Sequence, residues 1–413
     1  MDLSRRIYPL DPRELTEEQL AVVFAMTSRN PQPFDEIAKV VSAEKAADFH
    51  ERWVLNYGHA SVAEHAIIHM AIENISRLAC DTLEDNRLAS YTEKSSRYQL
   101  LAQGHYHIPR ELDGHPLLDT YVNTCGSLFR AYQQTVEKLL EYLRAITPQS
   151  KAERDSAYNL RLRRVATDVC RFLLPAATLT NVGMTLNARS MENAVRKLLS
   201  SDLVEEQEIG ESLREQGKTI TPTLIKYADR NEYLVLAREA QQATAREELH
   251  QLSYSDCKAE LVHYDSQAES KLVASLLYRF SSSSYQDVWQ RVEAMSQFQR
   301  EEVVHQALDG LGPHDIPLRE LETVDYTFDL VMDYGAYREF KRHRMQTYIA
   351  QPATVDLGYI IPDLILDAGL EESFRKAMQM TSEGFHTVSE ALPGVGEYLV
   401  THAHLRRVLS KMN

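Results

Sequence analysis

The sequence lacks the features that mark several large classes of protein. No apolar run among its 413 residues approaches the roughly 20 needed to cross a bilayer, so we expect no membrane partner. Arg5 and Arg6 near the start are not followed by an apolar segment, which argues against a secretory signal peptide. No Gly-x-Gly-x-x-Gly follows a predicted strand, so a Rossmann dinucleotide site is not supported.

Cysteine is scarce, and its spacing contains no metal-binding motif. The four cysteines, Cys80, Cys125, Cys170 and Cys257, form no CxxC pair. This pattern argues against a zinc site or a disulfide framework and fits a reducing, cytoplasmic compartment. We predict that all four are buried packing residues, and no base stands near them in the sequence to favour a thiolate nucleophile.

Positive charge is in deficit. The chain has 45 basic and 60 acidic side chains and a formal net charge of −15, whereas a surface that binds duplex nucleic acid needs a basic excess. We therefore expect no nucleic-acid partner. A few arginines gathered in one cleft still suffice for a phosphorylated small molecule, so their placement matters more than the total.

Two parts of the sequence correspond to each other at an offset of about 255 residues. In each, a Gly/His segment precedes a β-like run, and an arginine-containing segment follows it. The first set is Gly58-His59-Ala-Ser61-Val-Ala-Glu64-His65 and Asn86-Arg87; the second is Gly312-Pro313-His314, the run 327–332 and Arg342-His343-Arg344.

A weaker correspondence joins residues 175–187 to residues 401–413, at a shorter offset of about 226. The length alone favours two domains, and we place the copies at residues 1–235 and 250–413. The connecting segment 237–249 is rich in helix formers and has no Gly or Pro, so we predict that it is helical.

The apolar spacing predicts a mixture of helices and a few strands. We expect a strand over residues 66–75, a helix that begins at Ser76, and a second strand over 327–332. Helices are predicted at 15–26, 34–41, 119–146, 193–199 and 209–214. Because regular helices do not separate the strands, we prefer an α+β fold of two tandem domains, each with helices and an antiparallel sheet, over a doubly wound sheet.

The strongest motif is Arg87-Leu-Ala-Ser-Tyr-Thr-Glu93-Lys-Ser95-Ser96-Arg97-Tyr98, preceded by the Gly58 to His65 block. Together they resemble the signature of flavin-dependent thymidylate synthases, in which Arg-His-Arg is followed by Ser, then Glu or Gln, then Ser-x-Arg-Tyr. Residues 185–193, Thr-Leu-Asn187-Ala-Arg189-Ser-Met-Glu-Asn193, resemble the later Asn-x-Arg segment of that family.

The resemblance implies an FAD site and a site for deoxyuridine monophosphate (dUMP). The implied flavin-binding residues are His59, Ser61, Glu64, Arg87, Asn187, Arg189, Asn193 and the triplet Arg342, His343 and Arg344. Glu93, Ser95, Ser96 and Arg97 are implied to bind the nucleotide, and Glu93, Ser95 and Arg97 to act in catalysis. An arginine fork matches phosphate oxygens, and serine hydroxyls fill the remaining acceptors. No resident metal is expected.

Each copy departs from the family pattern in a different place. Copy one has Asp85-Asn86-Arg87 in place of Arg-His-Arg, and Leu198 where the family has an arginine that orients the base. Copy two keeps Arg342-His343-Arg344, but residues 348–359 lack the Glu-x-Ser-x-Arg-Tyr segment. The sequence stops at Asn413, where the Asn-x-Arg block would begin; either it is truncated there or this copy has lost its last helices.

Because the losses are complementary, we expect one composite site. Arg97, Ser95 and Glu93 would come from copy one, and Arg342, His343 and Arg344 from copy two. The family's homotetramers build their sites between subunits, so a homodimer of this chain would form a pseudo-tetramer.

Structural interpretations compete with these roles. Arg342-His343-Arg344 equally suits a basic helix C-terminus, and Asn187, Arg189 and Asn193 equally suit a helix start. His65 and His69 are four apart; on one strand they would lie about 13 Å apart and share no ion. The triplet His105-Tyr106-His107 is predicted to be a surface loop rather than a ligand.

The resemblance thus predicts FAD-dependent methylation of dUMP, with methylenetetrahydrofolate supplying the carbon and NADPH reducing the flavin. The losses at Asp85, Asn86 and Leu198 keep two alternatives open. One is a non-catalytic or repurposed module that binds flavin or nucleotide, and the other is a flavoenzyme that acts on a different pyrimidine nucleotide.

Overall fold

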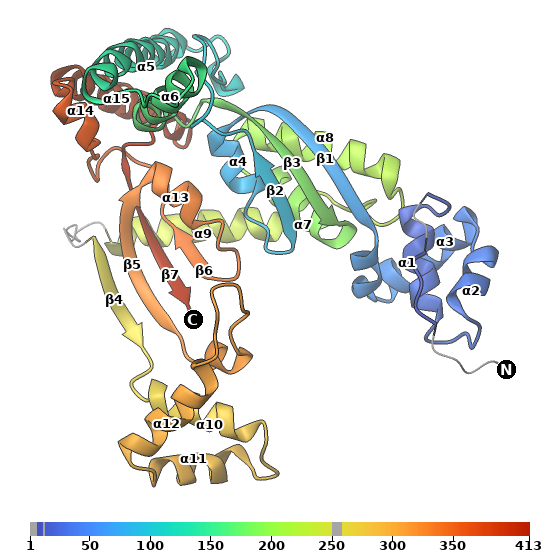
Figure 1. The fold of residues 1–413 in the computed structure, drawn as a ribbon. Coiled ribbons are helices and arrows are strands. Elements are labelled where there is room, and N and C mark those ends of the chain that lie inside the picture. The colour runs from blue at the N-terminus through green and yellow to red at the C-terminus, as the bar shows by residue number, and fades with distance from the viewer. Residues whose placement is uncertain (1–5, 11–12, 250–257) are drawn as a thin grey trace. The chain divides into compact units, whose positions relative to one another are not determined.

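The computed structural model describes residues 6–10, 13–249 and 258–413, so Cys257 lies outside the described residues. The chain divides into two compact units (Figure 1). Unit 1 comprises Met1–Ser253 and Thr354–His404, and unit 2 comprises Tyr254–Ala353 and Leu405–Asn413. These boundaries differ from the predicted copies 1–235 and 250–413, because residues 354–404 pack with the first unit. The copies, as sequence repeats, remain a prediction.

Unit 1 begins with a small helical cluster. Its members are α1 (Glu17–Met26), α2 (Phe34–Val40), α3 (Ala43–Phe49), the π-helix η1 (His50–Asn56) and the 3₁₀ helix η2 (Ala60–His65). Thr16 and Gln19 form a reciprocal capping box that satisfies the free backbone donors at the start of α1. Val22, Val23 and Ile37 form the apolar core of this cluster.

The sheet of unit 1 is antiparallel, with strand order β1-β3-β2. Its strands are β1 (Ile67–Ser76), β2 (Ala89–Glu93) and β3 (Leu179–Asn187). The central strand β3 alternates between faces, and its buried residues Val182, Met184 and Leu186 pack against the helices. Those helices are α4 (Arg77–Leu83), α7 (Ala188–Leu199) and α8 (Val204–Ile220). One end of β2 lies beside α4 (Figure 1).

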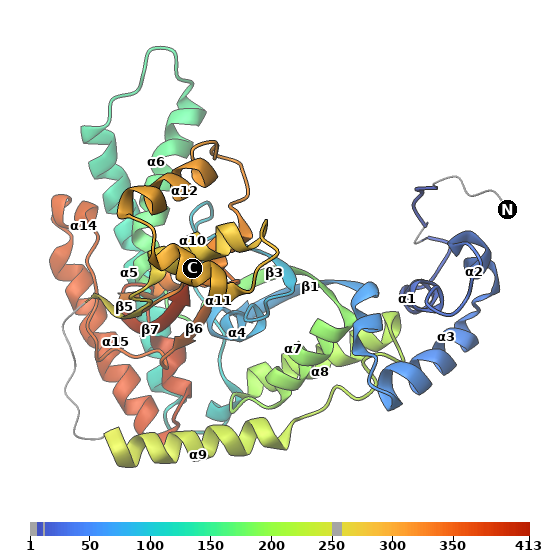
Figure 2. The same ribbon diagram turned by 90° about the horizontal axis from the view of Figure 1, so that it is seen from below.

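The second core of unit 1 joins helices that are distant in sequence. They are α5 (Leu118–Ile146), α6 (Asp155–Cys170), α14 (Asp363–Asp367) and α15 (Glu371–Ala391), and α5 and α15 lie side by side (Figures 1 and 2). Phe129 and Tyr132 of α5 share this core with Phe374 and Met378 of α15. Residues 354–404 are therefore integral to the first unit.

Two short segments pair reciprocally beneath these helices. The Ala176 N–H donates to the Val400 carbonyl at 2.8 Å, and the His402 N–H donates to the Leu174 carbonyl at 3.1 Å. The pairing continues from Ala177 to Tyr398, and from Ala403 to Phe172. With the offset of 226 residues between 175–187 and 401–413, Ala176 corresponds to His402 and Leu174 to Val400, so each of these two bonds is the counterpart of the other. Two similar segments that meet around a local twofold axis are expected to pair in this way.

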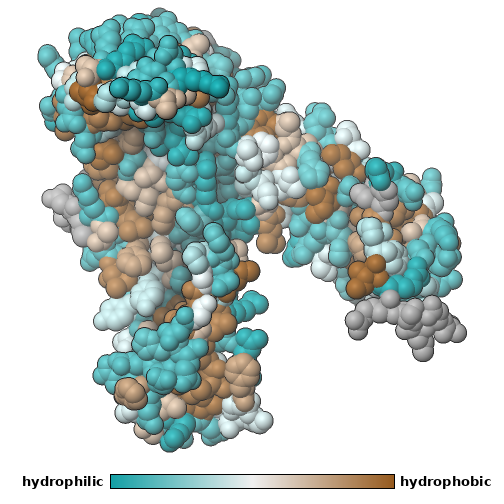
Figure 3. All heavy atoms as spheres, viewed as in Figure 1, coloured by the Kyte–Doolittle hydropathy of each residue, from teal (hydrophilic) through white to brown (hydrophobic). Residues whose placement is uncertain are grey.

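Unit 2 contains a four-stranded antiparallel sheet with the order β4-β5-β7-β6. The strands are β4 (Ala259–Tyr264), β5 (Tyr326–Asp333), β6 (Thr347–Ala350) and β7 (Leu405–Met412). Leu261, Val262 and Tyr264 leave the edge strand β4 apolar and exposed, and Figure 3 shows apolar residues over this sheet. The helices α10 (Ala268–Tyr278), α11 (Tyr285–Glu293) and α12 (Gln297–Leu308) form a separate apolar cluster.

The order of elements in unit 1 recurs farther along the chain. In each case a strand leads into a short helix, and the last residue of the strand is the N-cap of the helix. This residue is Ser76 for α4 and Asp333 for α13 (Tyr334–Phe340). A short strand, a long helix and a final strand follow. In each sheet the final strand lies between the first strand and the short strand, in the orders β1-β3-β2 and β5-β7-β6.

Most of the predicted elements are confirmed. The strands predicted at 66–75 and 327–332 are β1 and β5, and the helix expected to begin at Ser76 is α4. The predicted linker helix is part of α9 (Glu232–Leu249). Among the described residues, no helix combines the length and apolar character needed to span a membrane.

Two predictions about histidines are wrong. His65 ends the 3₁₀ helix η2, so it shares no strand with His69, whose Nδ1 lies 2.9 Å from the Thr185 hydroxyl. His107 is half-buried against Tyr398, with ring centroids 5.3 Å apart, rather than part of a surface loop. In both cases the deciding contacts come from segments far away in sequence.

Candidate active site

A cavity of unit 1 brings together three of the predicted flavin-binding residues. It encloses about 960 Å³ beside η1 and η2, and His59, Ser61 and Glu64 line it. Residues from α1 and the turn after it form the opposite wall, including Phe24 and Arg29. The capped start of α1 and the short η2 thus bring residues 24–31 and 59–65 to one cavity.

Aromatic rings dominate one side of this cavity. The His59 ring is nearly parallel to those of Tyr57 and Trp53, with centroid distances of 5.5 Å and 6.3 Å. The Arg29 guanidinium lies 4.4 Å from the Trp53 ring centroid, within the range of a cation–π contact. A flat aromatic ligand matches such a wall, and Arg29 supplies positive charge at its margin.

The Asn-x-Arg segment contributes one polar contact at this cavity. Arg189, near the start of α7, donates to Glu64, which lines the cavity. Asn187 caps α7 by accepting the Ser190 N–H at 2.8 Å, so the capping interpretation of this residue holds. Asn193 lies on α7, and no contact places it at the cavity.

The predicted phosphate-binding residues lie on the segment that follows β2. Ser96 is buried, Ser95 Oγ accepts the Arg97 N–H at 3.2 Å, and the Arg97 carbonyl accepts the Thr167 hydroxyl at 2.7 Å. The last bond fixes the segment against α6. The motif residues are therefore held in place by local and long-range hydrogen bonds rather than being a free surface loop.

Two further arginines, Arg164 within α6 and Arg171 directly after its last residue, lie on the same side of the helix axis as Thr167. Arg164 precedes Thr167 by three residues and Arg171 follows it by four, so helical spacing places all three on one side. The Arg164 guanidinium lies 5.1 Å from the Tyr98 ring centroid, and Arg171 pairs with Asp168 at 3.1 Å. The motif analysis missed both arginines, because they lie more than 60 residues after the motif, and the Thr167–Arg97 bond and the Arg164–Tyr98 contact form only in the folded chain.

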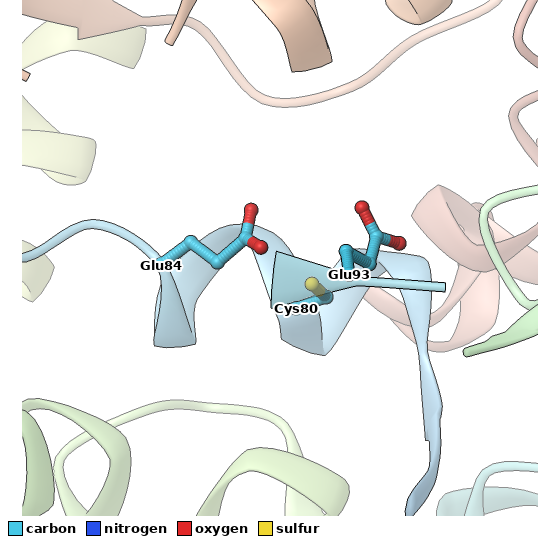
Figure 4. Close-up of side chains that lie close together, drawn as sticks. All are labelled: Cys80, Glu84 and Glu93. Carbon is cyan, nitrogen blue, oxygen red and sulfur yellow. The ribbon is translucent and has the colours of Figure 1, made fainter. Parts of the chain in front are cut away.

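Glu93 is held by a buried ion pair at the end of β2. Arg77 Nη1 lies 3.2 Å from Glu93 Oε1, and both side chains are 5% exposed. Cys80 and Glu84 of α4 place ligand-type atoms within 4.8 Å of the Glu93 carboxylate (Figure 4). A buried carboxylate needs a compensating charge, and Arg77 supplies it, so the cluster is explained as an ion pair with polar neighbours.

The residues that depart from the family pattern have structural partners. Lys197 Nζ lies 2.9 Å from Asp85 Oδ2, and Asn86 donates to the Leu83 carbonyl at 2.9 Å. Leu198 is 1% exposed and packs in the core beneath the sheet. The exposed Arg87 follows Asn86 in the turn between α4 and β2. These positions thus contribute to packing and ion pairing within unit 1.

The second arginine motif belongs to unit 2. Arg342, His343 and Arg344 follow α13 directly, and Arg342 pairs with Glu339 at 3.1 Å. Arg342 and His343 are exposed, whereas Arg344 is half-buried. This position after a strand-capped helix corresponds to that of Asp85, Asn86 and Arg87 after α4.

The model of the family described as "Thymidylate synthase complementing protein" matches residues 13–223. The chain belongs to this family, and the match lies within the predicted copy one.

Several relatives extend the comparison. A UPF0159 protein of Chlamydia muridarum is 32% identical over 391 residues, which cover 90% of this chain and 73% of the relative. A flavin-dependent thymidylate synthase of Clostridium tetani is 28% identical over 212 residues, 51% of this chain and 82% of that protein.

Among solved structures, a flavin-dependent thymidylate synthase from Helicobacter pylori, complexed with FAD and dUMP, is 21% identical. It matches 52% of this chain and 96% of its own, with a TM-score of 0.31.

Proposed function

We propose that this protein binds FAD and dUMP and methylates the uracil base, with methylenetetrahydrofolate as the carbon donor and NADPH as the reductant. The observation that carries the proposal is the cavity of about 960 Å³ that collects His59, Ser61 and Glu64. When bound, the flavin would supply hydride chemistry that amino-acid side chains cannot provide.

The residues around this cavity suit a flavin. Trp53 and His59 offer flat faces for a ring system, and Arg29 offers a cation for an anionic group. The volume is at the upper end of the range for small-molecule pockets. Arg189 would hold Glu64 in place, so the Asn-x-Arg segment would act there as an orienting element.

The segment after β2 suits a nucleotide phosphate. Ser95 and Ser96 would donate hydroxyl hydrogen bonds, and Arg97 would supply a guanidinium fork. Arg164 of α6 and Arg171, which directly follows that helix, add positive charge nearby. Glu93, oriented by Arg77, would accept from the base or ribose edge.

The described cysteines are poor candidates for a protein nucleophile. Burial raises the pKa of the Cys125 and Cys170 thiols far above their usual range, and Cys80 is fully buried. A thiol that stays protonated in an apolar site is a weak nucleophile. This supports a scheme in which the residues of the chain bind, orient and exclude water, while the flavin carries the reaction.

The surroundings of Asp85 and Leu198 favour a second function. Asp85 is paired with Lys197, and Leu198 is buried in the core, so neither position offers the family's cation. These contacts favour a module that binds flavin or nucleotide without thymidylate synthesis, or an enzyme with a different pyrimidine nucleotide as substrate.

We further infer that the chain arose by tandem duplication and acts as a homodimer. The recurring element order and the reciprocal pairing of 172–177 with 398–403 support the duplication. Two family-type repeats per chain would make a dimer equivalent to a four-domain assembly. Arg342, His343 and Arg344 are proposed to contribute to the same composite site as Arg97.

The purified protein tests the proposal directly. A flavin absorption band, either as isolated or after addition of FAD, is expected. Reduced flavin is then expected to reoxidise in a way that depends on dUMP and methylenetetrahydrofolate, with formation of thymidylate. Protein that binds no FAD contradicts both flavoenzyme functions, whereas FAD binding without a dUMP response points to the repurposed module or to a different pyrimidine nucleotide as substrate.

A further inference from the structure

A buried carboxylate, Glu205, connects three segments of unit 1 that are far apart in sequence. Glu205 is 6% exposed and lies in the first turn of α8. It accepts the Ser76 N–H at 2.7 Å, the Ser76 hydroxyl at 2.6 Å and the Tyr398 hydroxyl at 2.8 Å. Removing any one of these donors would leave part of a buried carboxylate unsatisfied.

The two bonds to Ser76 fix the junction between β1 and α4. Ser76 Oγ donates to Glu205 and accepts the Ala79 N–H at 2.9 Å, so the same hydroxyl caps α4. Its rotamer is therefore determined from both sides. The orientation of the first turn of α4 depends on this cap.

Arg77 is the next residue, and it transmits that orientation to the proposed nucleotide site. Its N–H donates to the Thr178 carbonyl at 3.1 Å, and its guanidinium pairs with Glu93 at 3.2 Å. A guanidinium buried in this way has little freedom to search for its partner. A small rotation at Ser76 would therefore displace the Glu93 carboxylate or break the ion pair.

Tyr398 reaches Glu205 from the downstream half of the chain. It lies in η6 (Val395–Leu399), is fully buried, and its backbone carbonyl accepts the Ala177 N–H at 2.7 Å. The His107 ring packs on the Tyr398 ring, and His107 Nδ1 lies 3.6 Å from Glu205. The tyrosine hydroxyl is thus held within reach of Glu205 by packing and backbone pairing.

We propose that Tyr398, acting through Glu205, Ser76 and Arg77, is a positioning residue for Glu93 in the nucleotide site. This inference rests on the proposed function, and it gives the downstream repeat a role in the site of the upstream one. Tyr398 touches no substrate in this scheme. It keeps the β1–α4 junction in the one orientation that presents Glu93.

The test compares full-length Tyr398→Phe with the wild type in calorimetric titrations with dUMP and in steady-state turnover. A displaced Glu93 carboxylate would weaken dUMP binding, and we set the expected weakening at roughly tenfold, near the lower end of the cost of losing one hydrogen bond to a charged group. We expect that rise in Kd and in KM for dUMP, with FAD binding unchanged. Tyr158→Phe is the matched control, because its hydroxyl also donates at 2.8 Å, to the Thr147 carbonyl on the α5–α6 hairpin.

A double-mutant cycle tests the link without any ligand. Glu93→Gln is expected to lower the unfolding midpoint less in the Tyr398→Phe background than in the wild type, because the pair is already misaligned there. Additive effects would overturn the proposal, as would equal dUMP affinity in Tyr398→Phe and the wild type. If the wild-type protein fails to bind dUMP, the proposed function is contradicted but the coupling between Tyr398 and Glu93 is not. The double-mutant cycle then tests that coupling without a ligand.

Discussion

At the scale of single residues, burial shifts the pKa of side chains that nothing in the sequence marks as unusual. Glu206, next to Glu205, is 5% exposed and accepts the Thr82 hydroxyl at 2.6 Å. Its pKa is raised to about 7, mainly by burial and in part by the nearby carboxylates Glu205 and Glu397. His404 shows the opposite case, because burial lowers its pKa to about 4.

Glu206 is expected to make folding less favourable as the pH rises. Between the ordinary carboxyl pKa near 4.5 and about 7, the folded state keeps a proton that the unfolded chain releases. The free energy of unfolding should therefore decrease across this window, by roughly 3 kcal/mol in total. Urea unfolding of the wild type and Glu206→Gln at several pH values measures the effect. The variant should lose this part of the slope, and parallel pH profiles would contradict the assignment.

His404 is expected to act in the other direction. Below pH 6.5 the His404 imidazole is protonated in the unfolded chain, whereas in the folded state it stays neutral down to about pH 4. Its contribution to stability is complete above pH 6.5 and falls as the pH drops through this window, again by roughly 3 kcal/mol. In His404→Gln the loss of stability between pH 6.5 and 4 should be smaller, as followed by circular dichroism.

At the scale of elements, the close approach of α5 and α15 depends on a glycine. A Cβ on Gly384 would lie 2.6 Å from Thr124 Oγ1, so the two helices approach more closely than an alanine permits. Thr124 cannot easily move away, because it is 5% exposed and donates to the Thr120 carbonyl at 2.8 Å.

Gly384→Ala is therefore expected to destabilise the protein by roughly 1–3 kcal/mol through overpacking. Gly126→Ala on α5 is the control. There a Cβ meets only Arg130 at 3.5 Å, and helix propensity favours alanine by about 1 kcal/mol. Differential scanning calorimetry should show a lower Tm for the first variant and an equal or higher Tm for the second. Adding Thr124→Ala to Gly384→Ala should recover part of the loss.

At the scale of the whole molecule, the downstream half completes the core of unit 1. Phe374, Met378 and Ala403 share one apolar core with residues of α5 and α6. Ending the chain after Leu249 would expose that surface, so residues 1–249 alone are expected to aggregate or to unfold without a cooperative transition. Co-expression with residues 258–413 should restore soluble protein. A monodisperse, cooperatively folding 1–249 fragment would show that the sequence copies fold independently.

The two arginine motifs also make a prediction for the whole molecule. If one composite site uses both, then Arg97→Ala and Arg342→Ala should each abolish binding of the nucleotide or of the flavin. Arg144→Ala, on the exposed end of α5, serves as a charge-matched control. Titration of each variant with FAD and dUMP is the measurement, and retention of both ligands by either motif variant contradicts the composite site.

Much of the architecture could be predicted because it is locally encoded. The apolar period of α5, the strand-to-helix change at Ser76 and the helix formers of α9 each follow from neighbouring residues, so their positions were correct. The family was likewise evident from the motifs around Arg87 to Tyr98 and Asn187 to Asn193. Patterns among neighbouring residues predict the local backbone conformation, and they also contain the motifs by which the family is identified.

The sequence by itself determined the family, the elements and the correspondence between 175–187 and 401–413. Only the tertiary structure decided that residues 354–404 belong to unit 1, that Arg164 and Thr167 contact the motif segment, and that His107 is half-buried. The same holds for the Arg77–Glu93 pair and for the Tyr398–Glu205 bond, which spans 193 positions. Such contacts depend on packing and desolvation between distant segments, and no local pattern records them.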